Sequence, residues 1–114
     1  MIFRLLVTVF VMIFGYSGAF IAPDYIVCID KQSCTHEIGH WLDKELGYPS
    51  QTTEFKSEID NNLPSIILNT TCIIRTEKCL YSEAYAKLYE AVEGDINKLP
   101  PNLKIFYKDV NNGI

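Results

Sequence analysis

The hydrophobic positions of the chain begin with one unbroken apolar segment near the N-terminus. A single arginine precedes the apolar residues 5–14, and small residues follow them at the spacing of a cleavage site that ends at Ala19. This pattern predicts a secretory signal peptide over residues 1–19 and one mature domain over residues 20–114. The alternative is an N-terminal membrane anchor, because apolar residues continue as far as Pro23 and the stretch is then just long enough to span a bilayer.

Beyond this segment the apolar positions take the spacing of short elements. Residues 24–29 are β-branched and aromatic, which predicts a strand. Residues 33–46 have a helical pattern that Gly47 ends, and a second helical pattern covers residues 53–63. Residues 65–74 are again β-branched and apolar, which favours either a short strand or an extended segment at the rim of the domain.

The C-terminal third of the chain predicts two more helices. Ser82 is expected to cap the first, which Gly94 ends, and its apolar stripe consists of Tyr85, Leu88, Tyr89 and Val92. The second follows Pro100 and ends before Asn112, and it presents Leu103, Phe106, Tyr107 and Val110 to the core. Together the elements predict an α+β fold that is mainly helical, and the strand pattern allows one short sheet in addition.

Length and charge limit the classes of function. A chain of 114 residues has room for one domain, and its hydrophobic content of 48% is that of a globular protein. The net charge is −4, and no cluster of basic residues interrupts the acidic balance. Nucleic acid is therefore not an expected partner, and neither is a membrane once the signal is removed. We expect a monomer.

The cysteines point to an oxidising compartment. All four lie beyond the predicted signal, and an even number in a small exported domain predicts two disulfides. Three pairings are open, of which the local one closes two short loops, Cys28 with Cys34 and Cys72 with Cys79. A zinc site built from all four cysteines is the rival interpretation, but the spacings exceed those usual for such sites.

The motif that carries chemistry is His36-Glu-Ile-Gly-His40, an HExxH pattern inside the first predicted helix. Four residues of a helix advance by about 400°, so both imidazoles lie on one face and can ligate the same Zn²⁺. Glu37 is rotated by about 100° from His36 and can reach the attacking water without becoming a ligand. This is the arrangement of metal-assisted hydrolysis.

A catalytic zinc site needs a third protein ligand, and the chain has no third histidine. A carboxylate is therefore expected, and the downstream candidates are Glu58, Asp60, Glu77, Glu83, Glu90 and Glu93. Glu83 is favoured because it begins the strongest helical pattern, on a face apart from the apolar stripe. Glu58 is the second choice, although the helix around it is short.

These segments together resemble the gluzincin metallopeptidases, especially the catalytic domain of anthrax lethal factor and its single-domain relatives. The resemblance rests on the HExxHxxD segment that ends at Asp43, on Ser82-Glu83-Ala-Tyr-Ala86, and on the aromatic C-terminal segment around Phe106. It implies a zincin-like domain in which an HExxH helix packs against a glutamate-bearing helix. It also implies that His36, His40 and Glu83 bind zinc, that Glu37 is the general base, and that the substrate is a peptide or protein.

The chain departs from this family at two positions. The relatives often carry an acid four residues after the third ligand, where this chain has Lys87, and often a tyrosine one or two turns before it, near Thr76. Tyr81 is the candidate to replace that tyrosine, and its hydroxyl would then donate to the oxyanion of the tetrahedral intermediate. The other interpretation of Tyr81 is an ordinary packing or surface tyrosine.

Two more residues of the motif helix carry expectations. Asp43 lies one turn beyond His40, where it would either accept a hydrogen bond from a histidine ring or remain a solvated surface charge. Gly39 lowers helix propensity by about 1 kcal/mol relative to alanine, which predicts that another segment approaches the helix closely at this position.

The sequence therefore predicts a secreted, disulfide-bonded zinc metalloendopeptidase. The alternative is a secreted binding or inhibitory protein that retains a zinc-binding helix without turnover, since a domain this small has little surface for a substrate cleft. Glu37 discriminates between the two, because metal binding needs only His36, His40 and a carboxylate, whereas hydrolysis also needs the base.

Overall fold

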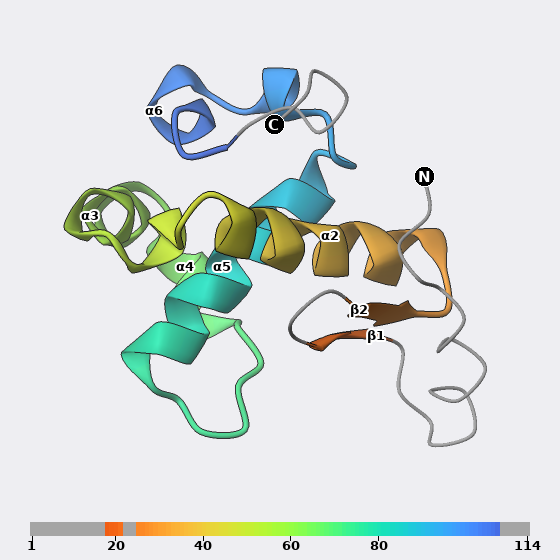
Figure 1. The fold of residues 1–114 in the computed structure, drawn as a ribbon. Coiled ribbons are helices and arrows are strands. Elements are labelled where there is room, and N and C mark those ends of the chain that lie inside the picture. Colours follow the sequence, from red (N-terminus) through yellow and green to blue (C-terminus); the bar gives the residue numbers. More distant parts are fainter. Residues whose placement is uncertain (1–17, 22–24, 108–114) are drawn as a thin grey trace.

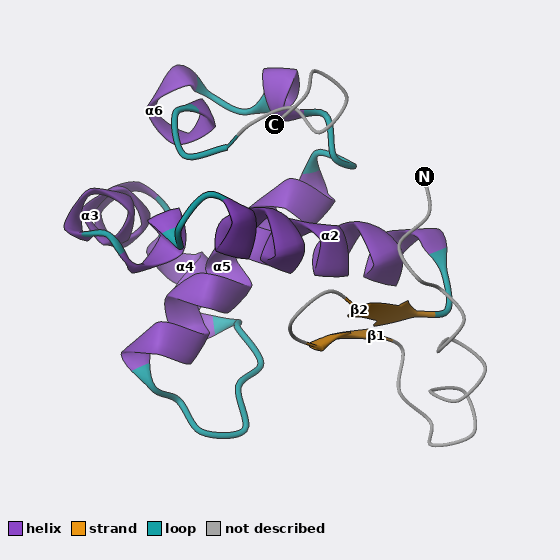
Figure 2. Cartoon of the chain, in the orientation of Figure 1, coloured by secondary structure: helices purple, strands orange, loops and turns teal. Residues whose placement is uncertain are grey.

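The computed structural model describes residues 18–21 and 25–107, and in this part of the chain two long helices cross at the centre (Figure 1). Helix α2 is Lys31–Glu45 and helix α5 is Glu77–Ala91, and the two form the largest packing contact between elements. The predicted mainly helical fold is confirmed for the described residues, and Figure 2 shows that the sheet is limited to one hairpin. Most of the predicted signal peptide lies outside the described residues.

The hairpin consists of β1, Gly18–Ile21, and β2, Tyr25–Cys28. The strands are antiparallel, with Gly18 opposite Cys28 and Ile21 opposite Tyr25. The strand predicted over residues 24–29 is thus present, and the hairpin lies along the first half of α2 (Figure 1). Within the described residues no helix combines the length and the apolar character that a membrane span requires.

Helix α2 starts two residues before the predicted boundary because Asp30 caps it. The Asp30 side chain accepts a hydrogen bond from the Ser33 backbone N–H, and the Ser33 side chain returns to the Asp30 backbone, which completes a capping box. The helix ends where predicted, because Gly47 adopts a φ of 79° that an L side chain rarely takes.

Helix α3, Thr53–Asn62, begins at the predicted residue, with Thr52 accepting a hydrogen bond from the Phe55 backbone N–H. The short 3₁₀ helix η2, Pro49–Gln51, joins it to α2. The sequence favoured a short strand or an extended segment over residues 65–74, and for residues 65–68 both are wrong, because Pro64–Leu68 forms the short helix α4. Residues 69–74 form no strand either. Proline suits the first turn of a helix, and this local preference outweighs the β-branched composition.

Helix α5 begins at Glu77, capped by Thr76, and not at the predicted cap Ser82. The segment from Thr76 to Tyr81 reads as polar and mixed in sequence, but it continues the helix by more than one turn. Ser82 is consequently an interior residue of the helix, and its side chain is free to contact α2. The predicted apolar stripe is confirmed, because Tyr85, Leu88 and Tyr89 are buried.

The C-terminal segment contains the 3₁₀ helix η3, Ile96–Lys98, and helix α6, which is limited to Pro101–Lys104. The predicted helix is therefore much shorter than expected, and the part toward Asn112 lies outside the described residues. The segment still braces the core as predicted: the Tyr107 hydroxyl donates to the Tyr85 carbonyl oxygen at 2.8 Å, and the two rings stack with centroids 4.0 Å apart.

The close approach predicted at Gly39 is confirmed. A Cβ atom placed there would lie 2.9 Å from Ala86 Cα, which is closer than real side chains come, and 3.1 Å from Tyr89 Cβ, which is tighter than most real contacts. The backbone of α5 therefore passes directly against α2 at this point. Since Gly39 lies between the two histidines, this contact brings one face of α5 up to the motif.

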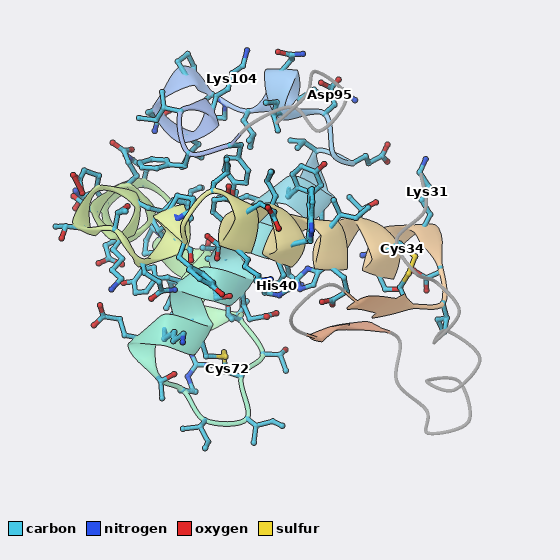
Figure 3. The ribbon with its side chains drawn as sticks, in the orientation of Figure 1. Lys31, Cys34, His40, Cys72, Asp95 and Lys104 are labelled. Atoms are coloured by element: carbon cyan, nitrogen blue, oxygen red, sulfur yellow. A yellow bond between two sulfur atoms is a disulfide. The ribbon has the colours of Figure 1, made fainter. Side chains whose placement is uncertain are left out.

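Both disulfides have the local pairing. Cys28 joins Cys34, which links β2 to the first turn of α2, and Cys72 joins Cys79, which closes the loop before α5 (Figure 3). The described residues contain no free cysteine, so the rival four-cysteine zinc site is wrong. The two disulfides are typical of an extracellular or otherwise oxidising compartment.

Candidate metal centre

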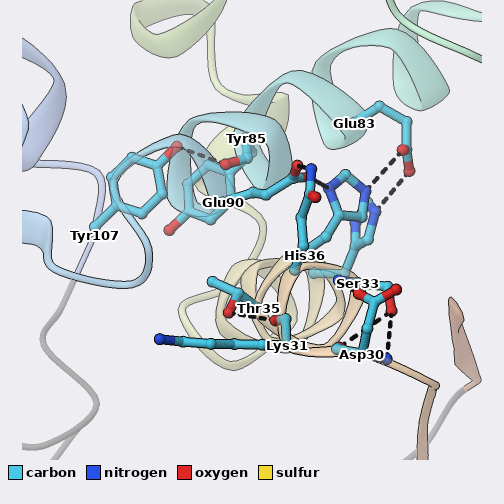
Figure 4. Close-up of polar contacts among 11 residues, drawn as sticks. Asp30, Lys31, Ser33, Thr35, His36, Glu83, Tyr85, Glu90 and Tyr107 are labelled. Carbon is cyan, nitrogen blue, oxygen red and sulfur yellow. Dashed lines mark hydrogen bonds and ion pairs between the residues drawn. The ribbon is translucent and has the colours of Figure 1, made fainter.

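Three of the predicted ligands come together where α2 crosses α5. His36 Nε2 lies 3.1 Å from one carboxylate oxygen of Glu83, and His40 Nε2 lies 2.6 Å from the other (Figure 4). One ligand atom from each of the three residues can be chosen so that all lie within 4.8 Å of one another. His36, His40 and Glu83 therefore form a candidate metal-binding group on two packed helices.

The local geometry follows from the helices that carry the ligands. His36 and His40 are four residues apart on α2, with ring centroids 5.0 Å apart and ring planes at 82°. Glu83 enters from the middle of α5, which the contact at Gly39 holds against α2. Each ligand is thus on a regular helix and not on a loop, which fixes its position well.

Each imidazole also has a partner on its second nitrogen. His36 Nδ1 lies 2.8 Å from Glu90 Oε1, and His40 Nδ1 lies 3.2 Å from Ser82 Oγ. Such contacts orient a metal-binding histidine and leave Nε2 as the ligand atom. Two imidazoles and one carboxylate are also the donor set of catalytic zinc sites that keep one position open. The residues present therefore fit a zinc ion.

The sequence interpretation missed both of these partners. Ser82 was expected to cap a helix, and Glu90 appeared only among the alternative third ligands. A signal for Glu90 was present, because it lies seven residues after Glu83 and two helical turns place both on the same face. No comparable signal existed for Ser82, whose position depends on the true start of α5.

Charge and burial shift the pKa values of the cluster in opposite directions. Burial raises the pKa of the Glu83 carboxyl, but hydrogen bonds and charge from His36 and His40 outweigh this and lower it to about 2. Burial lowers the pKa of His36, yet the hydrogen bond to Glu83 and the nearby carboxylates raise it overall. Glu83 is therefore ionised across the physiological range, as a metal ligand must be.

The predicted general base lies beside the cluster. Glu37 is 6% exposed, and burial raises its pKa, although the positive charge of His40 and His36 opposes this shift. A raised pKa suits a carboxylate that has to take up a proton and release it again near neutral pH. Glu37 is thus a buried carboxylate beside the candidate ligands, with a raised pKa.

A hollow of about 390 Å³ opens next to these residues. Six charged or titratable side chains line it, namely Asp30, His36, Glu37, Glu83, Lys87 and Glu90. The remaining described lining residues are Gln32, Ser33, Thr70 and Thr71, so each of them carries a polar or charged side chain. Two of the candidate ligands, His36 and Glu83, therefore share one hollow with Glu37.

Tyr81 does not join the site. Its hydroxyl donates to Asp60 on α3 at 2.5 Å, and Lys56 Nζ lies 5.6 Å from the centre of its ring. The hydrogen bond to Asp60 is the main cause that raises the pKa of Tyr81 to about 12. These contacts hold the phenol against α3 and do not support the predicted contact with an oxyanion.

Asp43 fulfils neither of its two predicted roles. It is 1% exposed, so it is not a solvated charge, and it accepts hydrogen bonds from the Ser50 backbone N–H at 3.1 Å and the Ser50 hydroxyl at 2.6 Å. Its carboxylate thus ties the end of α2 to η2. Burial raises the pKa of Asp43, and the two bonds from Ser50 oppose the shift.

The second-choice ligand Glu58 is also engaged elsewhere. Its carboxylate accepts hydrogen bonds from Asn62 at 2.8 Å and from Asn102 at 2.7 Å, which links α3 to α6. It is not part of the His36–His40–Glu83 group.

Comparison with known proteins identifies no relative: no protein-family model, no curated protein sequence and no solved structure matches this chain. The candidate metal-binding group therefore rests on the sequence motif and on the structure.

Proposed function

We propose that the protein is a secreted zinc-dependent peptidase of the gluzincin type. The observation that carries the proposal is the convergence of His36, His40 and Glu83 beside a buried glutamate, Glu37, at a polar hollow that His36, Glu37 and Glu83 line. Metal binding alone would not require Glu37, because the three other residues complete the ligand set. Hydrolysis, unlike metal binding, also requires a carboxylate beside the ligands, and Glu37 is such a residue.

In the proposed mechanism, His36, His40 and Glu83 hold the ion, and Glu90 and Ser82 fix the two imidazole rings. A bound zinc ion would polarise the scissile carbonyl and make water more acidic. Glu37 accepts the proton from the water that attacks the carbonyl carbon. The same carboxyl then delivers this proton to the leaving amine nitrogen as the C–N bond breaks.

The first part of the test is metal content. The wild-type protein, purified without chelators, is expected to contain one zinc per chain, whereas His40→Ala should contain almost none. Negligible zinc in both proteins, even after incubation with zinc and desalting, would contradict the metal site.

The second part is hydrolysis of a random peptide pool, followed by mass spectrometry. Wild-type protein is expected to cleave the pool, and Glu37→Gln should retain zinc but lose cleavage. If zinc-loaded wild-type protein cleaves nothing, the non-catalytic binding protein becomes the better interpretation. The two measurements therefore separate metal binding from catalysis.

A further inference from the structure

The polar hollow beside the candidate metal-binding group contains one positive charge, on Lys87, that forms no ion pair with a described residue. Lys87 is exposed at its wall, and its ammonium has no ion pair or hydrogen bond among the described residues. It carries the only permanent positive charge among the lining residues. An unpaired cation at the wall of a substrate pocket is available to an anionic group of the substrate.

Three of the four acidic residues that line the hollow already have partners, and the fourth, Glu37, is buried. Glu83 bonds to both histidines, and Glu90 bonds to His36 and Gln32. Asp30 accepts the capping hydrogen bond from the Ser33 backbone. Glu83, Glu90 and Asp30 thus have partners other than Lys87, and Lys87 forms no ion pair with any of the four acids.

The position of Lys87 on α5 places it beside the reacting group. It lies four residues after Glu83 and three before Glu90, so all three residues share one face of the helix. Thr70 and Thr71 also line the hollow, and Thr71 is exposed. A substrate group held by Lys87 would therefore lie within one helical turn of the third ligand.

We propose that Lys87 is a specificity-determining residue that binds a carboxylate of the substrate next to the scissile bond. This inference rests on the proposed peptidase function and names its substrate class: peptides with an acidic group at this position. Among the described residues none that lines the hollow is apolar, which disfavours an aliphatic or aromatic side chain there. The carboxylate has two sources, an acidic side chain or the C-terminus of the peptide.

The experiment measures binding without turnover, with zinc-loaded Glu37→Gln protein and calorimetry. The first pair of probes is acetyl-Ala-Ala-Glu-Ala-Ala-amide and its glutamine counterpart. The second pair is acetyl-Ala-Ala-Ala with a free C-terminal carboxylate and the same peptide as the amide. We expect the acidic member of one pair to bind about tenfold more tightly than its neutral partner, and the pair that shows this identifies the source.

The role of Lys87 is tested in the same protein. Lys87→Gln is expected to remove the tenfold preference, and Lys87→Arg should keep it because the charge remains. Lys98→Gln is the matched control, because Lys98 is an equally exposed lysine on η3 that does not line the hollow. All three variants change exposed side chains, so thermal unfolding is expected to stay close to that of the parent.

Two results would overturn the inference and leave the proposed function intact. One is binding of both members of each pair with equal affinity. The other is a preference for the acid that persists in Lys87→Gln, which would mean that Lys87 only balances the charges of Glu83 and Glu90. If no peptide binds the zinc-loaded protein and the wild type cleaves none, the proposed function itself fails.

Discussion

At the scale of single residues, Glu83 decides whether the two histidines form a metal site. Its carboxylate is the group on which both Nε2 atoms converge, and its side chain is 29% exposed, so it remains accessible to an ion from the hollow. Glu58, the alternative from the sequence, instead accepts hydrogen bonds from Asn62 and Asn102. The two glutamates therefore make a matched pair for mutation.

Substituting glutamine for Glu83 removes the negative charge and keeps the shape of the side chain. We expect Glu83→Gln to weaken zinc binding by at least 10- to 100-fold, roughly the loss that even outer partners of metal ligands produce. Glu58→Gln should leave zinc affinity nearly unchanged. Competition with a chromophoric chelator measures both values, and the opposite order would assign the ligand role to Glu58.

At the scale of elements, the site depends on how closely α2 and α5 pack. Gly39 has no side chain, so the backbone of α5 at Ala86 can approach within a distance that a Cβ atom would not permit. The histidines lie on either side of Gly39 along the helix, and Glu83 lies one turn from Ala86. The same contact thus stabilises the helix pair and sets the distance between the ligands.

Alanine at Gly39 would normally strengthen an exposed helix by about 1 kcal/mol. Here we expect the opposite sign, because the added Cβ meets backbone at 2.9 Å and the helices must separate. Gly39→Ala should lower the free energy of unfolding by roughly 1–3 kcal/mol in urea denaturation and also weaken zinc binding. Ser57→Ala, at an exposed position of α3, is the control. Equal or greater stability of Gly39→Ala would show that the helices are not in close contact at this point.

At the scale of the whole molecule, two disulfides join the ends of the central helices to the segments before them. Cys28–Cys34 ties the hairpin to α2, and Cys72–Cys79 ties the preceding loop to the start of α5. By loop entropy each contributes about 2 kcal/mol. A domain of this size buries a limited core, so these bonds are a substantial part of its stability.

For the exported protein we expect a mature N-terminus at Phe20 and no free thiol. Peptide mapping without reduction should recover the linked pairs Cys28–Cys34 and Cys72–Cys79, and alkylation before reduction should label no cysteine. Cleavage after Ala19 would leave only the second half of β1 to pair with β2. Recovery of an intact Met1 together with four alkylated cysteines would contradict both export and disulfide formation.

The two histidine ligands of the candidate metal site could be predicted from the sequence, because they depend only on the spacing of residues along one helix. The four-residue interval between His36 and His40 places two imidazoles on one helix face, whatever the rest of the chain does. Gly39 likewise predicted a close contact. A glycine inside a helix lowers the stability of the helix, so it is expected where a neighbouring segment leaves no space for a side chain. The third ligand was predicted from the strength of the helical pattern around Glu83.

The remaining features depend on contacts between segments far apart in the chain, which spacing does not encode. Ser82 became a partner of His40 because α5 starts at Glu77, and this start is set by a cap at Thr76 that the polar composition did not reveal. The spacing of Asp43 from His36 and His40 predicted that it lies on the same face of α2 as the histidines. In the structure the turn into η2 places Ser50 against Asp43, and both residues are buried.

The sequence by itself determined the ligand types, the spacing on α2 and the need for a close contact at Gly39, because these follow from helix periodicity and from the side chains available. Only the tertiary structure decided which carboxylate meets the histidines, which groups support their rings, and that Tyr81 turns to Asp60. The physical reason is that the crossing of α2 and α5 is fixed by packing around Gly39 and Ala86, and that crossing selects among side chains that are equivalent in the sequence.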